Sequence, residues 1–159
     1  MFLLAYPAKY LKVLAGKLSS RIFTQLLFIH TCRANEILAD FVREVFWNSF
    51  EAGKSTITKD DAERFVLDGI DRGKTSVHWA ESTVRRVSSY LTGACVDFGL
   101  LKKESKSEFM LYPYRIEEKA AVYLAYDLHF SGFGDNTVLG HQDWALFGLG
   151  REDVLVEFK

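Results

Sequence analysis

Apolar residues between positions 82 and 98 recur every three or four residues, which is the spacing of an amphipathic helix. At about 100° per residue, one face of this helix carries Val84, Val87, Leu91, Ala94, Cys95 and Phe98. The opposite face carries Ser82, Arg85, Arg86 and Ser89. We therefore expect the first face to pack on a core and the second to meet solvent or a ligand.

Both ends of this predicted helix have a local signal. Ser82 precedes the first apolar position and is predicted to act as the N-cap, and Gly99 lies where a left-handed residue commonly ends a helix. A basic run with Lys102, Lys103 and Lys106 follows, and then comes an apolar and aromatic stretch. This order predicts a β-hairpin with a basic tip.

The residues before this helix extend the pattern. Asn35 is predicted to cap a helix that ends near Gly53, residues 55–57 form a short extended piece, and Thr58 caps a further helix. Helix, strand, helix, long helix and hairpin is the order of elements in a winged helix-turn-helix. The link over residues 69–79 is longer than the tight turn usually found between the second and third helices.

Helical patterns also occur on both sides of this module. A helix is predicted from residue 116 to about residue 129, a glycine-rich break follows it, and Asp135 and Asn136 are expected to cap the next element. We predict a mainly α fold with a central winged helix-turn-helix-like module and a small β-hairpin wing. The expected segments are an N-terminal basic helical segment at 1–34, the module at 35–115 and a C-terminal helical segment at 116–159.

Charge is segregated along the chain, although the net charge is only −1. Residues 1–34 carry five basic and no acidic side chains, and residues 72–115 carry eight basic and four acidic ones. Arginine presents a planar fork to phosphate or guanine, and serine hydroxyls bond to either. The predicted DNA-binding residues are Ser82, Arg85, Arg86, Ser89, Lys102, Lys103 and Lys106. The plainer alternative, a solvated helix face, stays open at this point.

The two cysteines and the N-terminal region bear on the compartment. Cys32 and Cys95 are isolated in apolar helical patterns, which predicts buried thiols. The chain shows no secretory signal, and its longest uncharged run near the N-terminus, residues 22–32, is too short to span a bilayer. We expect a cytoplasmic protein. The lysines of the first segment favour a helix packed on the core, with an interfacial helix or a DNA contact as alternatives.

Catalysis has weak support in the sequence. His129, Asp135, His141 and Asp143 lie close together, and such residues ligate metals or perform acid–base chemistry. Their spacing matches no recognised ligand motif, and the chain contains no phosphate-binding loop or nucleophile elbow. Capping and hydrogen-bonding roles explain the four residues more simply. We expect no enzymatic activity, no cofactor and no metal.

Several motifs resemble the BrxA family, the small accessory proteins of BREX bacteriophage-exclusion systems. The motifs that carry this resemblance are Trp79-x-x-x-Thr83-Val84-x-Arg86, Phe98-Gly99-Leu100-Leu101, Tyr123-Leu124 with Leu128-His129 and Gly132, and His141-x-Asp143-Trp144-x-Leu146-Phe147-Gly148-Leu149 with Asp153-Val154. The stretch from Ala34-Asn35 to Asp40-Phe41-Val42 and Val45 is similar to the helix that precedes the family's first wing. The resemblance covers roughly residues 20 to 158.

The resemblance implies a mostly helical protein with winged-helix-like parts that binds double-stranded DNA, mainly through the backbone, and has no catalytic activity. Family members generally extend further at both ends, so the resemblance also implies a C-terminal segment truncated relative to the family. The leading expectation is a DNA-binding accessory factor of phage defence. The alternative is an assembly adaptor that holds another BREX protein through its acidic flanks and the apolar cluster around Trp144 and Phe147.

Overall fold

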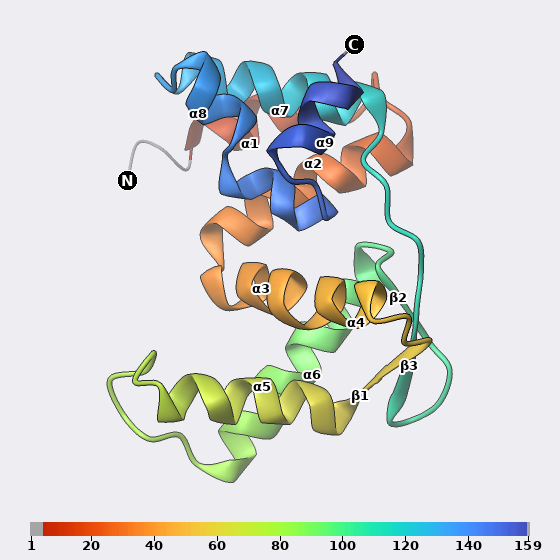
Figure 1. Cartoon of the computed structure of the whole chain (residues 1–159), viewed down its shortest axis with the longest axis vertical. Coiled ribbons are helices and arrows are strands. Elements are labelled where there is room, and N and C mark those ends of the chain that lie inside the picture. Colours follow the sequence, from red (N-terminus) through yellow and green to blue (C-terminus); the bar gives the residue numbers. More distant parts are fainter. Residues whose placement is uncertain (1–4, 159) are drawn as a thin grey trace. The chain divides into compact units, whose positions relative to one another are not determined.

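The computed structural model of the protein describes residues 5–158, with side chains from residue 9 onward (Figure 1). This part of the chain is mainly helical and contains one small three-stranded antiparallel sheet. The prediction of a mainly α fold with a small β wing is therefore confirmed. It divides into two compact units. The central unit comprises residues 37–114, and the terminal unit joins the residues up to 36 with those from 115 onward. The described parts of the N- and C-terminal segments fall in this one unit.

The central unit contains three helical pieces, a strand, two helices and a hairpin. In chain order they are α3 (Glu36–Phe41), η1 (Val42–Trp47), α4 (Asn48–Glu51), β1 (Thr56–Thr58), α5 (Lys59–Asp71), α6 (Glu81–Asp97), β2 (Leu101–Lys103) and β3 (Glu108–Leu111). In Figure 1 they run from orange through green to turquoise. The element η1 is a π-helix inside the segment that the sequence pattern predicted as one regular helix.

The sheet of the central unit has the strand order β1-β3-β2, with antiparallel pairing throughout. Ile57 on β1 lies opposite Phe109 on β3, and Leu101 on β2 lies opposite Leu111. All four side chains are buried, because alternate residues of a strand point to the same face and this face meets the core. β2 is an edge strand, so its outer backbone edge has no partner strand within the sheet.

Helix α5 begins with the predicted Thr58 cap. The Thr58 hydroxyl accepts a hydrogen bond from the Asp61 backbone at 3.2 Å, and the Asp61 carboxylate accepts one from the Thr58 backbone at 2.9 Å, forming a capping box. Burial of Asp61 works to raise the pKa of its carboxyl, but the hydrogen bonds from Thr58 outweigh it, and the pKa is lowered. This arrangement fixes the start of α5 directly after β1.

Helix α6 packs against α5 and leads into β2. Its predicted N-cap was wrong: Ser82 lies within the first turn, and Ala80 is the N-cap, with a carbonyl that accepts hydrogen bonds from the backbones of Thr83 and Val84. The predicted end is confirmed, because Gly99 has a φ of 87° directly after the C-cap. The link before α6 spans residues 72–80, since α5 continues to Asp71 and so past the expected start of the link at residue 69.

The terminal unit consists of helical elements only, within the described residues. They are α1 (Ala5–Leu14), α2 (Ser20–Ala34), α7 (Glu118–Phe130), α8 (Asp135–Leu139), the 3-10 helix η2 (Gln142–Phe147) and α9 (Arg151–Glu157). The expected caps of α8 were wrong: Asp135 begins the helix itself, and Gly134 is the N-cap without a side-chain hydrogen bond. Among the described residues, no helix is long and apolar enough to cross a membrane.

A buried glutamine connects the two sequence segments of the terminal unit. Gln25 of α2 is 1% exposed. Its amide nitrogen donates to the carbonyl of Arg115 at 2.8 Å, and its amide oxygen accepts from the backbone N–H of Glu117 at 2.8 Å. Two backbone groups just before α7 are thereby satisfied by one side chain from α2. This contact spans about 90 positions of sequence.

Candidate nucleic-acid interface

The exposed face of α6 carries the predicted contact residues. Ser82, Arg85, Arg86 and Ser89 are all exposed, whereas Val84 and Leu91 on the other face are buried. Arg85 forms an ion pair with Glu81 one turn earlier on the same face. Arg86 has no acidic partner among the residues that the structure describes. The two adjacent arginines therefore differ in how readily a new anion can engage them.

The hairpin after α6 exposes all three predicted lysines. Lys102 lies opposite Met110 and Lys103 lies opposite buried Phe109, so the two neighbouring lysines start from opposite faces of the edge strand β2. Lys106 belongs to the turn, where the Ser105 hydroxyl accepts hydrogen bonds from the backbones of Ser107 and Glu108. The sequence predicts one basic tip, but the alternation of the strand places Lys102 and Lys103 on opposite faces.

The same face of α6 has two further residues that are not among the predicted contacts. Tyr90 is exposed one turn after Arg86, and Gly93 lies one turn after Ser89. A methyl group added at Gly93 would meet no heavy atom within 4 Å. Ser88 and Thr92, by contrast, are buried and donate their hydroxyls to backbone carbonyls one turn earlier. Helical periodicity alone places Tyr90 and Gly93 on the arginine face, so the sequence contains the information needed to predict both.

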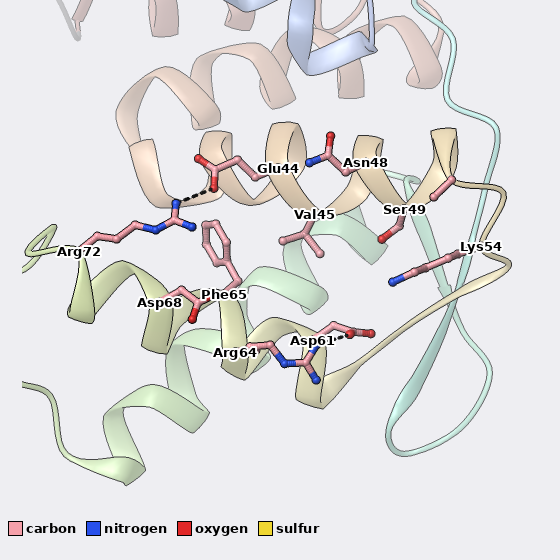
Figure 2. A pocket seen from close by; sticks show the side chains of 11 residues that line it. Glu44, Val45, Asn48, Ser49, Lys54, Asp61, Arg64, Phe65, Asp68 and Arg72 are labelled. Atoms are coloured by element: carbon pink, nitrogen blue, oxygen red, sulfur yellow. Dashed lines mark hydrogen bonds and ion pairs between the residues drawn. The ribbon is translucent and has the colours of Figure 1, made fainter.

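A separate pocket lies in the central unit between the η1–α4 segment and α5, with a volume of about 440 Å³ (Figure 2). Its arginines are directed at acidic side chains: Arg64 pairs with Asp61 at 3.3 Å, and Arg72 approaches Glu44 at 4.0 Å. The lining thus has mixed charge, with three basic and three acidic side chains: Lys54, Arg64, Arg72, Glu44, Asp61 and Asp68.

The link before α6 is tied to this region by Lys74. Its ammonium group donates to Asp40 at 2.9 Å and lies 3.6 Å from Glu44. The hydrogen bond to Asp40 raises the pKa of Lys74. These contacts attach the start of the long link to the η1 region.

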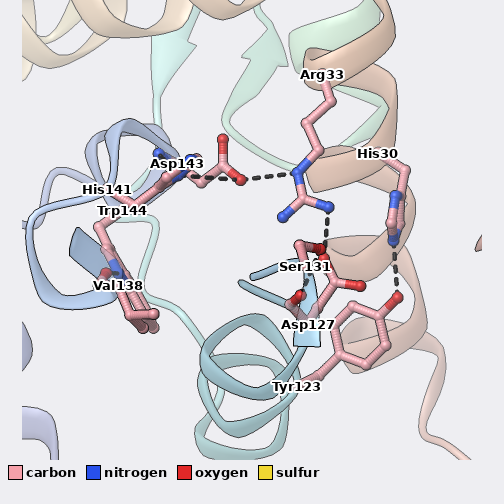
Figure 3. Close-up of polar contacts among 9 residues, drawn as sticks. All are labelled: His30, Arg33, Tyr123, Asp127, Ser131, Val138, His141, Asp143 and Trp144. Atoms are coloured by element: carbon pink, nitrogen blue, oxygen red, sulfur yellow. Dashed lines mark hydrogen bonds and ion pairs between the residues drawn. The ribbon is translucent and has the colours of Figure 1, made fainter. Parts of the chain in front are cut away.

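Two of the four residues considered for catalysis, His141 and Asp143, are drawn with their contacts in Figure 3. Asp143 is buried and accepts from the Arg33 guanidinium at 2.7 Å, while His141 caps η2 by accepting from the Asp143 backbone at 3.2 Å. His129 lies 3.8 Å from Asp135. No group of three potential metal ligands occurs among the described residues. The structure thus divides the four residues between two separate pairs.

Arg33 connects α2 to both α7 and η2. Besides Asp143, it donates to Asp127 at 2.6 Å. Burial opposes the charge on Arg33, but the two carboxylates together outweigh it and raise the pKa of the guanidinium. Beside it, His30 and the Tyr123 hydroxyl are 2.8 Å apart. Burial lowers the pKa of His30, with Arg33 adding to the effect, and burial raises the pKa of Tyr123 to about 12.

The apolar cluster expected to serve an adaptor role is not available at the surface. Trp144 is 1% exposed and Phe147 is 2% exposed. The Trp144 indole donates to the carbonyl of Val138 at 2.7 Å, and the Phe147 ring packs edge-on against Phe28. That part of the alternative hypothesis was wrong, because both side chains belong to the core of the terminal unit. The predicted burial of Cys32 and Cys95 is confirmed.

The described structure is that of a small, mainly helical protein whose central unit exposes a basic helix face and a basic hairpin. The sequence profile of the family BrxA matches residues 3–126. The chain therefore belongs to the BrxA family, as its motifs indicated, and is a BREX-associated protein. Searches of curated proteins and of solved structures gave no match.

Proposed function

We propose that this member of the BrxA family is a non-catalytic accessory factor of BREX that binds double-stranded DNA through its central unit. The observation that carries the proposal is the exposed face of α6, where Arg86 has no acidic partner among the described residues and a lysine-bearing hairpin follows directly. The order of elements and the strand order β1-β3-β2 support a winged-helix-like scaffold for this surface.

In the proposed complex, α6 presents its exposed face to the duplex. Arg86 contacts a phosphate or a base edge, Ser82 and Ser89 donate hydroxyl hydrogen bonds that fix the position, and Arg85 joins once it leaves Glu81. Lys102, Lys103 and Lys106 add charge from the hairpin. Because these contacts are mainly to the backbone, the affinity depends strongly on salt and weakly on sequence.

The test is a titration of duplex DNA with the full chain at two salt concentrations. Changing Arg85 and Arg86 together to alanine is expected to weaken binding and to reduce the dependence of the affinity on salt. The matched control changes Arg64 and Arg72 to alanine, because both are exposed arginines of the same unit that lie on α5 or directly after it. An α6 double variant that binds as tightly as the control at low salt would contradict the proposal.

A further inference from the structure

Helix α7 of the terminal unit carries a strip of exposed apolar and aromatic side chains. Val122, Tyr126 and Phe130, which we call the aromatic ledge, are 40%, 62% and 80% exposed. They follow one another at intervals of four residues, so they lie along one side of the helix. The rings of Tyr126 and Phe130 stack with centroids 6.1 Å apart. Stacking prearranges the two rings, but it leaves most of their area in water.

Such a surface is costly in water and is typical of an interaction site. The other side of α7 is already occupied: Ala120, Ala121, Leu124 and Leu128 are buried in the core. Tyr123 and Asp127 meet His30 and Arg33 of α2, as Figure 3 shows. The ledge therefore lies on the side of α7 that is not buried in the core. Helices that dock on partners commonly use apolar anchors one turn apart, and aromatic residues dominate the energy of such interfaces.

The charged side chains beside the ledge indicate which kind of partner side chain can bind there. The His129 ring packs against Phe130 at 5.5 Å, and its Nδ1 lies 3.8 Å from Asp135, so Asp135 stands at the Phe130 end of the ledge. The side chain of Asp135 is 94% exposed. An exposed carboxylate next to exposed aromatic rings suits an arginine, whose planar guanidinium stacks on a ring while it pairs with the carboxylate.

The charge nearest the ledge bears on the class of its occupant. Asp135 is the exposed acid at the Phe130 end, and among the described residues it has no lysine or arginine partner. A phosphate or an anionic lipid headgroup placed on the Phe130 ring would be repelled by this carboxylate. A protein segment that carries an arginine has the complementary charge.

We propose that the aromatic ledge of α7, together with Asp135, binds an arginine-containing amphipathic helix of a partner protein. Apolar side chains of the partner pack on Val122, Tyr126 and Phe130, and an arginine at one end reaches Asp135. Lys119 at the start of α7 sets the opposite sign at the other end of the ledge and so orients the partner. This contact uses the terminal unit, so it is independent of DNA binding by the central unit.

The test uses the full chain and a fluorescent helix-forming peptide of leucine, alanine and arginine, with leucines one turn apart and arginines flanking them. A second peptide carries glutamate in place of arginine. Fluorescence anisotropy is expected to show binding of the arginine peptide only. Phe130→Glu and Tyr126→Glu should each weaken it by about tenfold or more, which is a typical loss at an aromatic anchor. Asp135→Asn should weaken the arginine peptide severalfold.

Two exposed residues of α9 supply matched controls. Val156→Glu introduces the same charge at an apolar side chain that is 68% exposed, and Glu152→Gln removes an exposed carboxylate as Asp135→Asn does. Both should leave peptide affinity unchanged. Circular dichroism and urea unfolding of each variant establish that it is folded.

Several results would overturn the proposal. These are equal binding of the glutamate peptide, no effect of the Phe130 and Tyr126 variants on peptide affinity, or equal losses in the α9 controls. Sedimentation velocity covers self-association, and flotation with phosphatidylserine vesicles covers lipid. A dimer or a vesicle complex that Phe130→Glu abolishes would assign the ledge to a second copy or to a membrane surface instead.

Discussion

The ion pair between Arg85 and Glu81 makes the two arginines of α6 experimentally distinguishable. In B-DNA, each phosphate contact changes the logarithm of the affinity by about 0.9 for each tenfold change in salt, which is roughly eightfold in affinity. Arg86 has no acidic partner among the described residues, so Arg86→Ala should remove about one such contact. Arg85 must first leave Glu81, and an exposed pair of this kind is worth roughly 0.5 kcal/mol, or about twofold in affinity.

We therefore expect Arg85→Ala to reduce duplex affinity less than Arg86→Ala does. Glu81→Gln should raise affinity about twofold or more, because it releases Arg85 and removes a negative charge from the interface. In the Glu81→Gln background, Arg85→Ala should become as damaging as Arg86→Ala. The measurement is a double-mutant cycle in which the affinity of each variant is determined at several salt concentrations.

Two outcomes of the same double-mutant cycle would contradict this reasoning. If Arg85→Ala costs as much as Arg86→Ala in the native background, the Glu81 pair does not restrain Arg85. If none of the three substitutions changes the salt slope, the exposed face of α6 does not contact phosphates. Arg64→Ala, which also removes a charge that is paired with an acid on the same helix, is the control for a general loss of positive charge.

Further predictions concern stability and the close approach of α6 to DNA. Arg33→Ala strands the buried Asp143 carboxylate, and urea unfolding should show a loss of about 3 kcal/mol. Gln25→Ala leaves two backbone groups unpaired and should cost about 2–4 kcal/mol in the same assay. Burial lowers the pKa of His30 below its ordinary 6.5, so the unfolded chain binds the proton more readily than the folded chain does. The free energy of unfolding should therefore fall as the pH drops below about 6.5. His30→Gln should flatten this pH dependence. Gly93→Ala should stabilise the fold by about 0.5–1 kcal/mol, because alanine favours a helix and the added methyl group has open space around it. The same methyl group would stand on the arginine face of α6, so the substitution should weaken duplex binding.

Local signals in the sequence predicted the elements of the central unit well. The spacing of Val84 and Leu91 gave the buried face of α6, Gly99 gave its end, and Thr58 gave the start of α5, because each depends on neighbours within a turn or two. The predicted cap at Ser82 was wrong because a residue type that favours the N-cap can also stand inside a helix. Ser82 is the second residue of α6, and Ala80 is the N-cap.

Long-range contacts explain what the sequence pattern did not provide. The pairing of Gln25 with the segment before α7 and the burial of Trp144 depend on residues far apart in the chain, which periodicity does not report. At the candidate interface, periodicity predicted the exposure of Arg85 and Arg86. The opposite faces of Lys102 and Lys103 follow from the two-residue repeat of a strand, once the register of β2 is known.

The discontinuous terminal unit has a consequence for synthesis on the ribosome. The acceptors and donors that complete Gln25 lie about 90 positions later in the chain, and at about 5–20 residues per second the ribosome takes roughly 5–18 s to reach them. Throughout that interval, the nascent α2 exposes Leu26, Phe28 and Ile29, which are fully buried in the finished protein. Residues 37–114 are synthesised in between, so the two segments of the terminal unit join only after the whole central unit has been made.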